Sequence, residues 1–194
     1  MKIFKHRNEE LIMEKFKKYF ERYRSFVGIV GLLIVLYFAK PDAKSIAIGF
    51  FFIMLGTFFR AWASGFINKN TELATGGPYA LSRNPLYFGN FILGLGIAIA
   101  ANDLYCYIIV ALYYIFFFPA LMVMERNRMR KIFGEQYDNW SRGLNTFFPG
   151  IKKISFKGFN ISYYMKNKEY KVIYFSLFIV IALIFKALFY YRKI

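Results

Sequence analysis

Two clusters of polar residues border long apolar runs, and they are where this chain could carry out chemistry. The first cluster consists of a glycine-rich loop, Thr75–Tyr79, followed by Arg83, Asn84, Tyr87 and Asn90. Adjacent glycines let backbone N–H groups approach a ligand closely. A polar side chain at the depth of Asn90 usually faces a cavity or another helix. A second interpretation stays open, in which Arg83 anchors the chain at a membrane surface and Asn90 bonds to a neighbouring helix.

The second cluster begins at Glu125, the first charged residue after the apolar run Leu104–Met124. Basic residues follow it at once, and Tyr137 and Trp140 lie further along. A carboxylate in this position either pairs with its basic neighbours or holds a cationic cofactor at the membrane boundary. The sequence leaves both roles open.

Other chemistries lack the residues they need. The single His, His6, lies in the polar N-terminal segment, and no Cys/His cluster has the spacing of a metal site. The single Cys, Cys106, lies within an apolar run and is interpreted as a small buried residue. Gly94-Leu95-Gly96 begins like a dinucleotide-binding pattern but lacks the third glycine, so it indicates close packing between helices. We therefore expect no catalytic His or Cys and no metal site.

The composition indicates an integral membrane protein. Hydrophobic residues make up 58% and aromatic residues 22% of the 194 residues, which is more apolar surface than a soluble fold of this length can bury. The net charge is +16, but the charges flank apolar runs and do not form one soluble face. Nucleic-acid binding is therefore not expected.

The apolar runs predict an all-α, multi-pass transmembrane bundle of about five spans. One run is too long for a single span and is interrupted by Asn102 and Asp103, so it predicts a tight helical hairpin. A helical extension beyond the fourth span is expected in the cytoplasm. The predicted spans are Ser25–Ala39, Ser45–Phe66, Leu86–Ala100, Leu104–Met124 and Val172–Tyr191.

The charges predict an orientation. Most of the 27 Lys and Arg residues lie in the N-terminal segment, in the Ile67–Asn84 loop and in Glu125–Lys171, which a five-span arrangement places on one side of the membrane. The positive-inside rule assigns that side, and with it the N-terminus and the active site, to the cytoplasm.

The chain is expected to have three parts. In the first part Ile12, Phe16, Tyr19 and Tyr23 recur with helical spacing, which predicts an amphipathic surface helix. The basic residues near Ile151–Tyr170 predict a connector bound to anionic lipid. The parts are an N-terminal segment (1–24), a membrane core (25–150) and a connector with a C-terminal span (151–194).

The two polar clusters resemble a known family. The segment Gly77–Gly89 is similar to the GPY-x3-R-H/N-P-x-Y-x-G signature of isoprenylcysteine carboxyl methyltransferases and related phospholipid methyltransferases. The segment Glu125–Pro149, with Phe133-Gly134, Tyr137 and Trp140, is similar to their C-terminal block. The resemblance covers roughly Arg60 to Pro149.

This resemblance implies an S-adenosylmethionine-dependent methyltransferase, whose lipid or lipid-linked acceptor, such as an isoprenylcysteine carboxylate, enters from the bilayer. The implied cofactor-binding residues are Pro78, Tyr79, Arg83, Asn84, Tyr87, Glu125 and Tyr137. Arg83 and Glu125 are also candidates for a catalytic role. Candidates for the substrate pocket are Asn90, Arg60 and Trp140.

The chain departs from the family pattern at three places, and these departures leave the acceptor open. Asn84 replaces the commoner His, Arg126 replaces a second Glu, and Asn145 and Thr146 stand where the family often has an Arg. The alternatives are an NAD(P)H-dependent membrane reductase similar to the sterol reductases, which tend to have Asn where this chain has Leu86, and a non-catalytic membrane homologue. The sequence gives no indication of the oligomeric state.

Overall fold

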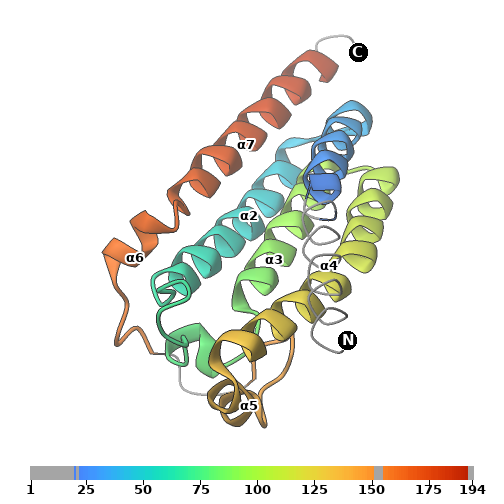
Figure 1. Cartoon of the computed structure of the whole chain (residues 1–194). Helices are drawn as coiled ribbons and strands as arrows, with labels where there is room; N and C mark the ends of the chain where they lie inside the picture. The colour runs from blue at the N-terminus through green and yellow to red at the C-terminus, as the bar shows by residue number, and fades with distance from the viewer. Residues whose placement is uncertain (1–19, 21, 151–154, 192–194) are drawn as a thin grey trace, which may run out of the picture.

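The computed structural model describes residues 20, 22–150 and 155–191, and the regular structure within these ranges is entirely helical (Figure 1). The predicted all-α class is therefore confirmed. Most of the expected N-terminal amphipathic helix, and His6 with it, lies outside the described residues. After a helix over residues 22–38 come α2 (Ala43–Ser64), the 3-10 helix η1 (Gly77–Ala80), α3 (Pro85–Ala101), α4 (Leu104–Phe133), α5 (Glu135–Ser141), α6 (Ile161–Lys166) and α7 (Tyr170–Tyr191).

Helices occupy all five predicted spans. Among the described residues, α2, α4 and the Tyr170–Phe189 part of α7 are long and apolar enough to cross a membrane, while α3 is apolar but shorter, with 17 residues. Large apolar side chains cover the outer surface of the bundle. Phe116 of α4 is 70% exposed and Phe178 of α7 is 62% exposed. Such a surface is suited to hydrocarbon rather than to water.

The predicted hairpin turn between α3 and α4 is confirmed. Asn102 ends α3 in the left-handed conformation, with φ 51°. Asp103 then caps α4 by accepting a hydrogen bond from the Tyr105 backbone N–H at 3.0 Å. An ion pair joins this turn to the loop between the 22–38 helix and α2, because Lys40 Nζ lies 2.9 Å from Asp103 Oδ2.

Helices α2 and α3 pack with their backbones in close contact. A Cβ atom added at Gly56 would lie 2.5 Å from the Leu93 backbone nitrogen, and one added at Gly96 would lie 2.6 Å from that of Ile53. Only glycine permits this approach, so the predicted role of Gly96 in helix packing is confirmed. Gly94, in contrast, makes room for the ring of Tyr114 on α4.

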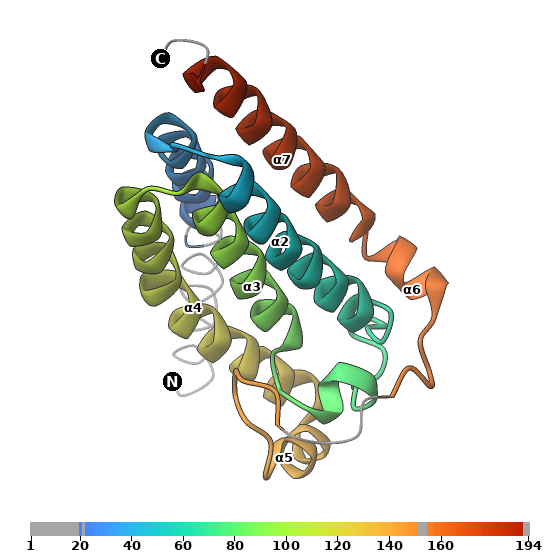
Figure 2. The same ribbon diagram turned by 180° about the vertical axis from the view of Figure 1, so that it is seen from behind.

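Helix α4 extends beyond its apolar run. The predicted span ends at Met124, but the helix continues through the charged residues to Phe133 and stops at Gly134, which has φ 52°. The short helix α5 follows, and an ion pair of 2.7 Å between Arg130 and Asp138 joins it to α4. We call the end of the bundle that carries η1 and α5 the polar end (Figure 2).

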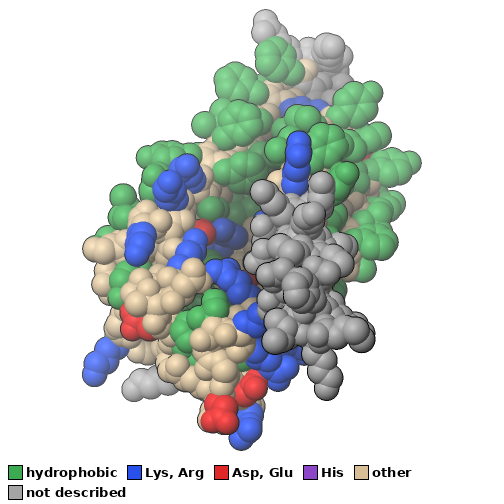
Figure 3. All heavy atoms as spheres, in the orientation of Figure 1, with side chains coloured by type: hydrophobic (Ala, Val, Ile, Leu, Met, Phe, Trp, Pro, Cys, Tyr) green, Lys and Arg blue, Asp and Glu red, His purple; other side chains and the backbone are tan. Residues whose placement is uncertain are grey.

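The two ends of the bundle differ in their surfaces. Lys and Arg side chains gather around the polar end, and apolar side chains dominate the other part of the face shown in Figure 3. Cys106 lies inside the bundle with 0% exposure, in a core that also contains Val35, Ile53 and Ile179. Its interpretation as a small buried residue is confirmed.

Candidate functional site

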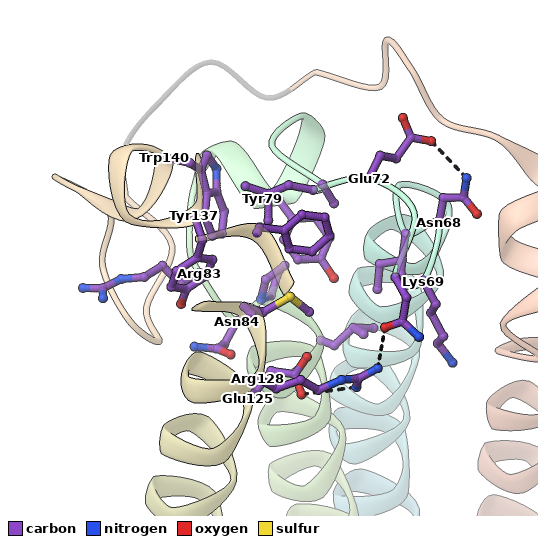
Figure 4. Close-up of a pocket in the computed structure, with 18 of the residues that line it drawn as sticks. Asn68, Lys69, Glu72, Tyr79, Arg83, Asn84, Glu125, Arg128, Tyr137 and Trp140 are labelled. Atoms are coloured by element: carbon purple, nitrogen blue, oxygen red, sulfur yellow. Dashed lines mark hydrogen bonds and ion pairs between the residues drawn. The ribbon is translucent and has the colours of Figure 1, made fainter. Parts of the chain in front are cut away.

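A pocket of about 270 Å³ lies at the polar end, between η1, α4, α5 and the loop that leaves α2 (Figure 4). This volume is close to the lower limit of the range for ligand pockets, roughly 300–1,000 Å³. The lining combines aromatic rings with charged and amide side chains. The sequence-predicted residues that line it are Tyr79, Arg83, Asn84, Tyr87, Glu125, Tyr137 and Trp140.

The glycine-rich loop positions Tyr79. Gly77 has φ 53°, and a Cβ atom there would overlap the ring of Phe66, so this position needs glycine. The turn then carries Tyr79 into the protein, where it is 8% exposed. Burial, together with the charge of Glu125, raises the pKa of the Tyr79 phenol. Its hydroxyl therefore remains protonated. Pro78, in the same turn, is buried and is not among the residues that line the pocket.

Arg83 and Asn84 connect the two polar clusters. Arg83 donates from Nε to the Leu144 carbonyl at 2.9 Å, and Asn84 donates from Nδ2 to the Thr146 carbonyl at 2.9 Å. The Arg83 backbone N–H donates to the Asn145 carbonyl at 3.0 Å. These bonds use backbone carbonyls, so they form regardless of the side chains at positions 145 and 146. This chain lacks the Arg that the family often has here, but the connection between the two clusters does not depend on it.

Glu125 lies in the wall that α4 contributes. Its side chain is 30% exposed, and its Oε2 is 3.8 Å from Nη1 of Arg128, one turn further along α4. Arg128 in turn donates from Nη2 to Oδ1 of Asn70 at 2.7 Å. Among the described residues, the ion pair of this carboxylate with Arg128 is a long one. Arg126 is exposed and is not part of the pocket lining.

Helix α5 supplies Tyr137 and Trp140, whose ring centroids are 5.5 Å apart. Tyr137 is 5% exposed, and burial raises the pKa of its phenol. The indole Nε1 of Trp140 is buried and has no acceptor among the described residues. A buried donor without a partner is unusual in a folded protein, and here it belongs to a residue that lines a pocket.

A second cavity, of about 310 Å³, is lined by the 22–38 helix, α3, α4 and Phe175 of α7. Asn90 lines it, three residues along α3 from Tyr87, which lines the first pocket. One face of α3 therefore runs from the first pocket to the second cavity. Glycines at positions 28, 31 and 94 are part of the lining, and Arg24 and Ser25 lie at one end of it.

Arg60, a candidate for the substrate pocket, lines neither cavity. Its guanidinium forms a bidentate ion pair with Glu169, with N···O distances of 2.9 to 3.1 Å. The side chains are 18% and 13% exposed. A charge within an apolar run marks a functional site by default, but here it has a structural partner far along the chain.

Sequence reasoning missed the loop between α2 and η1, which forms a large part of the pocket wall. The available signal was a run of polar residues, Asn68 to Glu72, directly before the glycine-rich motif. Its lining residues are Ile67, Asn68, Lys69, Asn70, Glu72, Leu73 and Ala74. Within the described part of the chain, no group of three His, Cys, Asp or Glu residues could hold a metal ion.

Comparison with known proteins decides the family. The pattern of the phospholipid methyltransferase family matches residues 24–136, which is more than half of the chain. The chain belongs to this family. Together with the apolar helices, the match identifies an integral membrane protein, and it supports a membrane methyltransferase.

Two curated relatives are similar to this member of the phospholipid methyltransferase family. The nickel-cobalt-cadmium resistance protein NccN of Alcaligenes xylosoxydans xylosoxydans is 28% identical over 136 residues, which are 66% of this chain and 63% of the relative. The cobalt-zinc-cadmium resistance protein CzcN of Cupriavidus metallidurans is 31% identical over 108 residues, which are 55% of this chain and 50% of the relative. The chain thus spans about half to two thirds of these relatives. No solved structure matches it significantly.

The phospholipid methyltransferase match and the pocket coincide closely. The match includes the α2–η1 loop, η1, α3 and α4, and it ends at Gln136. Tyr137 and Trp140 lie just beyond it, and α6 and α7 lie entirely outside it. Most of the pocket lining therefore belongs to the part of the chain that the family shares.

Proposed function

We propose that this protein is an S-adenosylmethionine-dependent methyltransferase that acts on a lipid or lipid-linked acceptor. The observation that carries the proposal is that two polar clusters, far apart in the sequence, line one pocket at the polar end of an apolar bundle. Tyr79 and Tyr87 come from the first cluster, and Glu125 comes from the second. The positive-inside rule favours a cytoplasmic location for this end.

The donor set of the pocket fits S-adenosylmethionine, which when bound supplies a methyl group on a positively charged sulfur. Glu125 provides a carboxylate for a cation at the membrane boundary. Aromatic faces such as that of Tyr87 attract cations as well. The buried Nε1 of Trp140, which has no acceptor in the described part of the chain, would donate to a polar atom of the cofactor. Lys69 and the remaining N–H groups of Arg83 suit its carboxylate.

The second cavity suits the apolar part of the acceptor. It contains apolar side chains of α3, α4 and the 22–38 helix, with Arg24 at one end. The face of α3 between Tyr87 and Asn90 joins it to the first pocket. An acceptor whose chain lies in this cavity would present its reactive group near Tyr87.

The residues limit the proton chemistry. Methyl transfer depends mainly on in-line positioning of the two reactants. A carboxylate acceptor has no proton to lose, whereas an amine or phenol needs a base. Tyr79 is a poor base because its raised pKa keeps the phenol protonated, so it acts as a hydrogen-bond donor. Glu125 is the candidate base for a protonated acceptor.

A transfer assay tests the proposal and identifies the acceptor. The purified protein is incubated with methyl-labelled S-adenosylmethionine and a membrane lipid extract, and the labelled product is identified by mass spectrometry. We expect label in a lipid-soluble product and its loss in Tyr87→Ala. Failure to bind S-adenosylmethionine, combined with binding of NADPH, would instead favour the membrane reductase alternative. Binding of neither would favour the non-catalytic homologue.

A further inference from the structure

The wall of the first pocket formed by residues 67–74 has little regular structure of its own. It consists of turns and bends between α2 and η1. Its internal bonds are local, such as the one at 3.1 Å from Asn68 Nδ2 to Glu72 Oε1. A loop of this kind needs partners elsewhere in the chain to keep one conformation.

Arg128 of α4 supplies one such partner, through its hydrogen bond to Asn70. Further partners are in and around α6, which lies outside the family match. Asn167 follows α6, and its side-chain amide donates two hydrogen bonds to the start of the loop. Nδ2 lies 3.0 Å from the Ser64 carbonyl oxygen and 2.9 Å from that of Ile67. One amide thus satisfies two carbonyls where α2 ends and the pocket wall begins.

A second contact fixes the far part of the loop. The hydroxyl of Tyr163, on α6, lies 3.0 Å from Oε1 of Glu72. Glu72 itself lines the pocket, and its pKa is lowered by hydrogen bonds from Asn68 and Tyr163. The carboxylate therefore stays ionised and oriented. A backbone bond of 2.9 Å from Asn160 to Gly65 completes the contact between the two segments.

Helix α6 is itself anchored to the bundle. The Arg60–Glu169 ion pair lies just beyond it, with both side chains mostly buried. Further along, the hydroxyls of Thr57 and Ser176 are 3.0 Å apart in a buried hydrogen bond between α2 and α7. These bonds hold the segment around α6 against α2 and α7 (Figure 1). The residues of α6 that contact the loop therefore have a fixed position.

We propose that Asn167 and Tyr163 are positioning residues for the methyl-donor pocket, and that they act by holding the 67–74 wall in its binding conformation. This inference rests on the proposed function, since it assumes that the pocket binds S-adenosylmethionine. It assigns a role at the shared site to a segment that the family match does not include.

The experiment compares Asn167→Asp and Tyr163→Phe with a matched control, Tyr164→Phe, in the full-length protein. Asn167→Asp replaces a donor with an acceptor against two carbonyls, and Tyr163→Phe removes only the hydroxyl. The control removes the hydroxyl of the adjacent residue of α6, for which no hydrogen-bond partner is seen among the described residues, and it keeps the backbone bond from Tyr164 to the Asn160 carbonyl. Amide hydrogen exchange of residues 67–74 is measured without ligand, and steady-state kinetics give the KM values for S-adenosylmethionine and the acceptor.

We expect Asn167→Asp to speed exchange in the loop and to raise the KM for S-adenosylmethionine by roughly three- to tenfold, as the loss of one or two hydrogen bonds implies. Tyr163→Phe should have a smaller effect in the same direction, and the control should have none. The acceptor KM, and kcat at saturating cofactor, should stay constant, which a general loss of folding would not produce. Unchanged exchange, or faster exchange with an unchanged cofactor KM, would overturn the inference. A wild-type protein that does not bind S-adenosylmethionine would overturn the proposed function instead, and the ligand-free exchange would still show whether α6 holds the loop.

Discussion

Replacing Glu169 with Gln would leave the Arg60 guanidinium without its countercharge in a mostly buried position. Loss of one partner of a fully buried ion pair costs roughly 3–5 kcal/mol. The two side chains are 18% and 13% exposed, and Gln keeps one oxygen that accepts a hydrogen bond, so we expect a smaller loss of about 2–3 kcal/mol. For a chain of this size, that corresponds to a decrease in Tm of about 5–10 °C.

The matched control is Asp138→Asn, the same type of substitution in a shorter but more exposed pair. Arg130 and Asp138 are 2.7 Å apart, with side chains 51% and 42% exposed. An exposed ion pair contributes at most about 1 kcal/mol, so the Tm should fall by less than about 4 °C. Thermal unfolding of both variants in the same detergent decides the matter. Equal shifts, or a larger shift in Asp138→Asn, would refute the reasoning that burial makes the Arg60–Glu169 pair important.

Two further predictions concern the bundle. Gly56→Ala forces a Cβ atom to within 2.5 Å of the Leu93 nitrogen and should destabilise the protein by about 1–3 kcal/mol. Gly31→Ala, which meets only Ile109 at 3.7 Å, should leave the Tm unchanged or slightly raised, and equal losses would contradict the packing argument. The hydrogen bond from Lys40 lowers the pKa of Asp103. This carboxylate therefore stabilises the fold fully above its unfolded pKa of about 3.9. The stabilisation is lost as the pH falls through the lower pKa of the folded state. The decrease in Tm over that acidic range should be smaller in Asp103→Asn; a decrease as large as in the wild type would count against this contribution.

The sequence predicted the positions of the helices well because apolar runs determine what lies in a membrane. The predicted span ends at Met124, and the helical extension expected beyond it is confirmed, because α4 continues to Phe133 through residues that still favour a helix. The actual stop is Gly134, whose positive φ ends the helix. Asn102 and Asp103 predicted the hairpin turn correctly, because residues of these types are typical of turns and caps.

The candidate site was predicted only in part, because some of its contacts join residues that are far apart in the sequence. The two polar clusters carry recognisable motifs, and the structure brings most of their residues to one pocket. Arg60 was a candidate for the substrate pocket, and the sequence did not predict its ion pair with Glu169, which lies 109 residues away. The wall at 67–74 was missed, and the sequence does not reveal its hydrogen bond with Asn167, 100 residues after Ile67. Single-sequence patterns do not identify partners of this kind.

Calorimetric titration with S-adenosylmethionine tests the central claim, that the pocket at the polar end binds the methyl donor. The wild-type protein should bind it, and Glu125→Ala should weaken binding by at least about tenfold, or roughly 1.4 kcal/mol. Arg126→Ala, one residue further along α4 but outside the pocket lining, should have a clearly smaller effect. The claim is contradicted if the wild-type protein does not bind S-adenosylmethionine, or if Arg126→Ala weakens binding more than Glu125→Ala does.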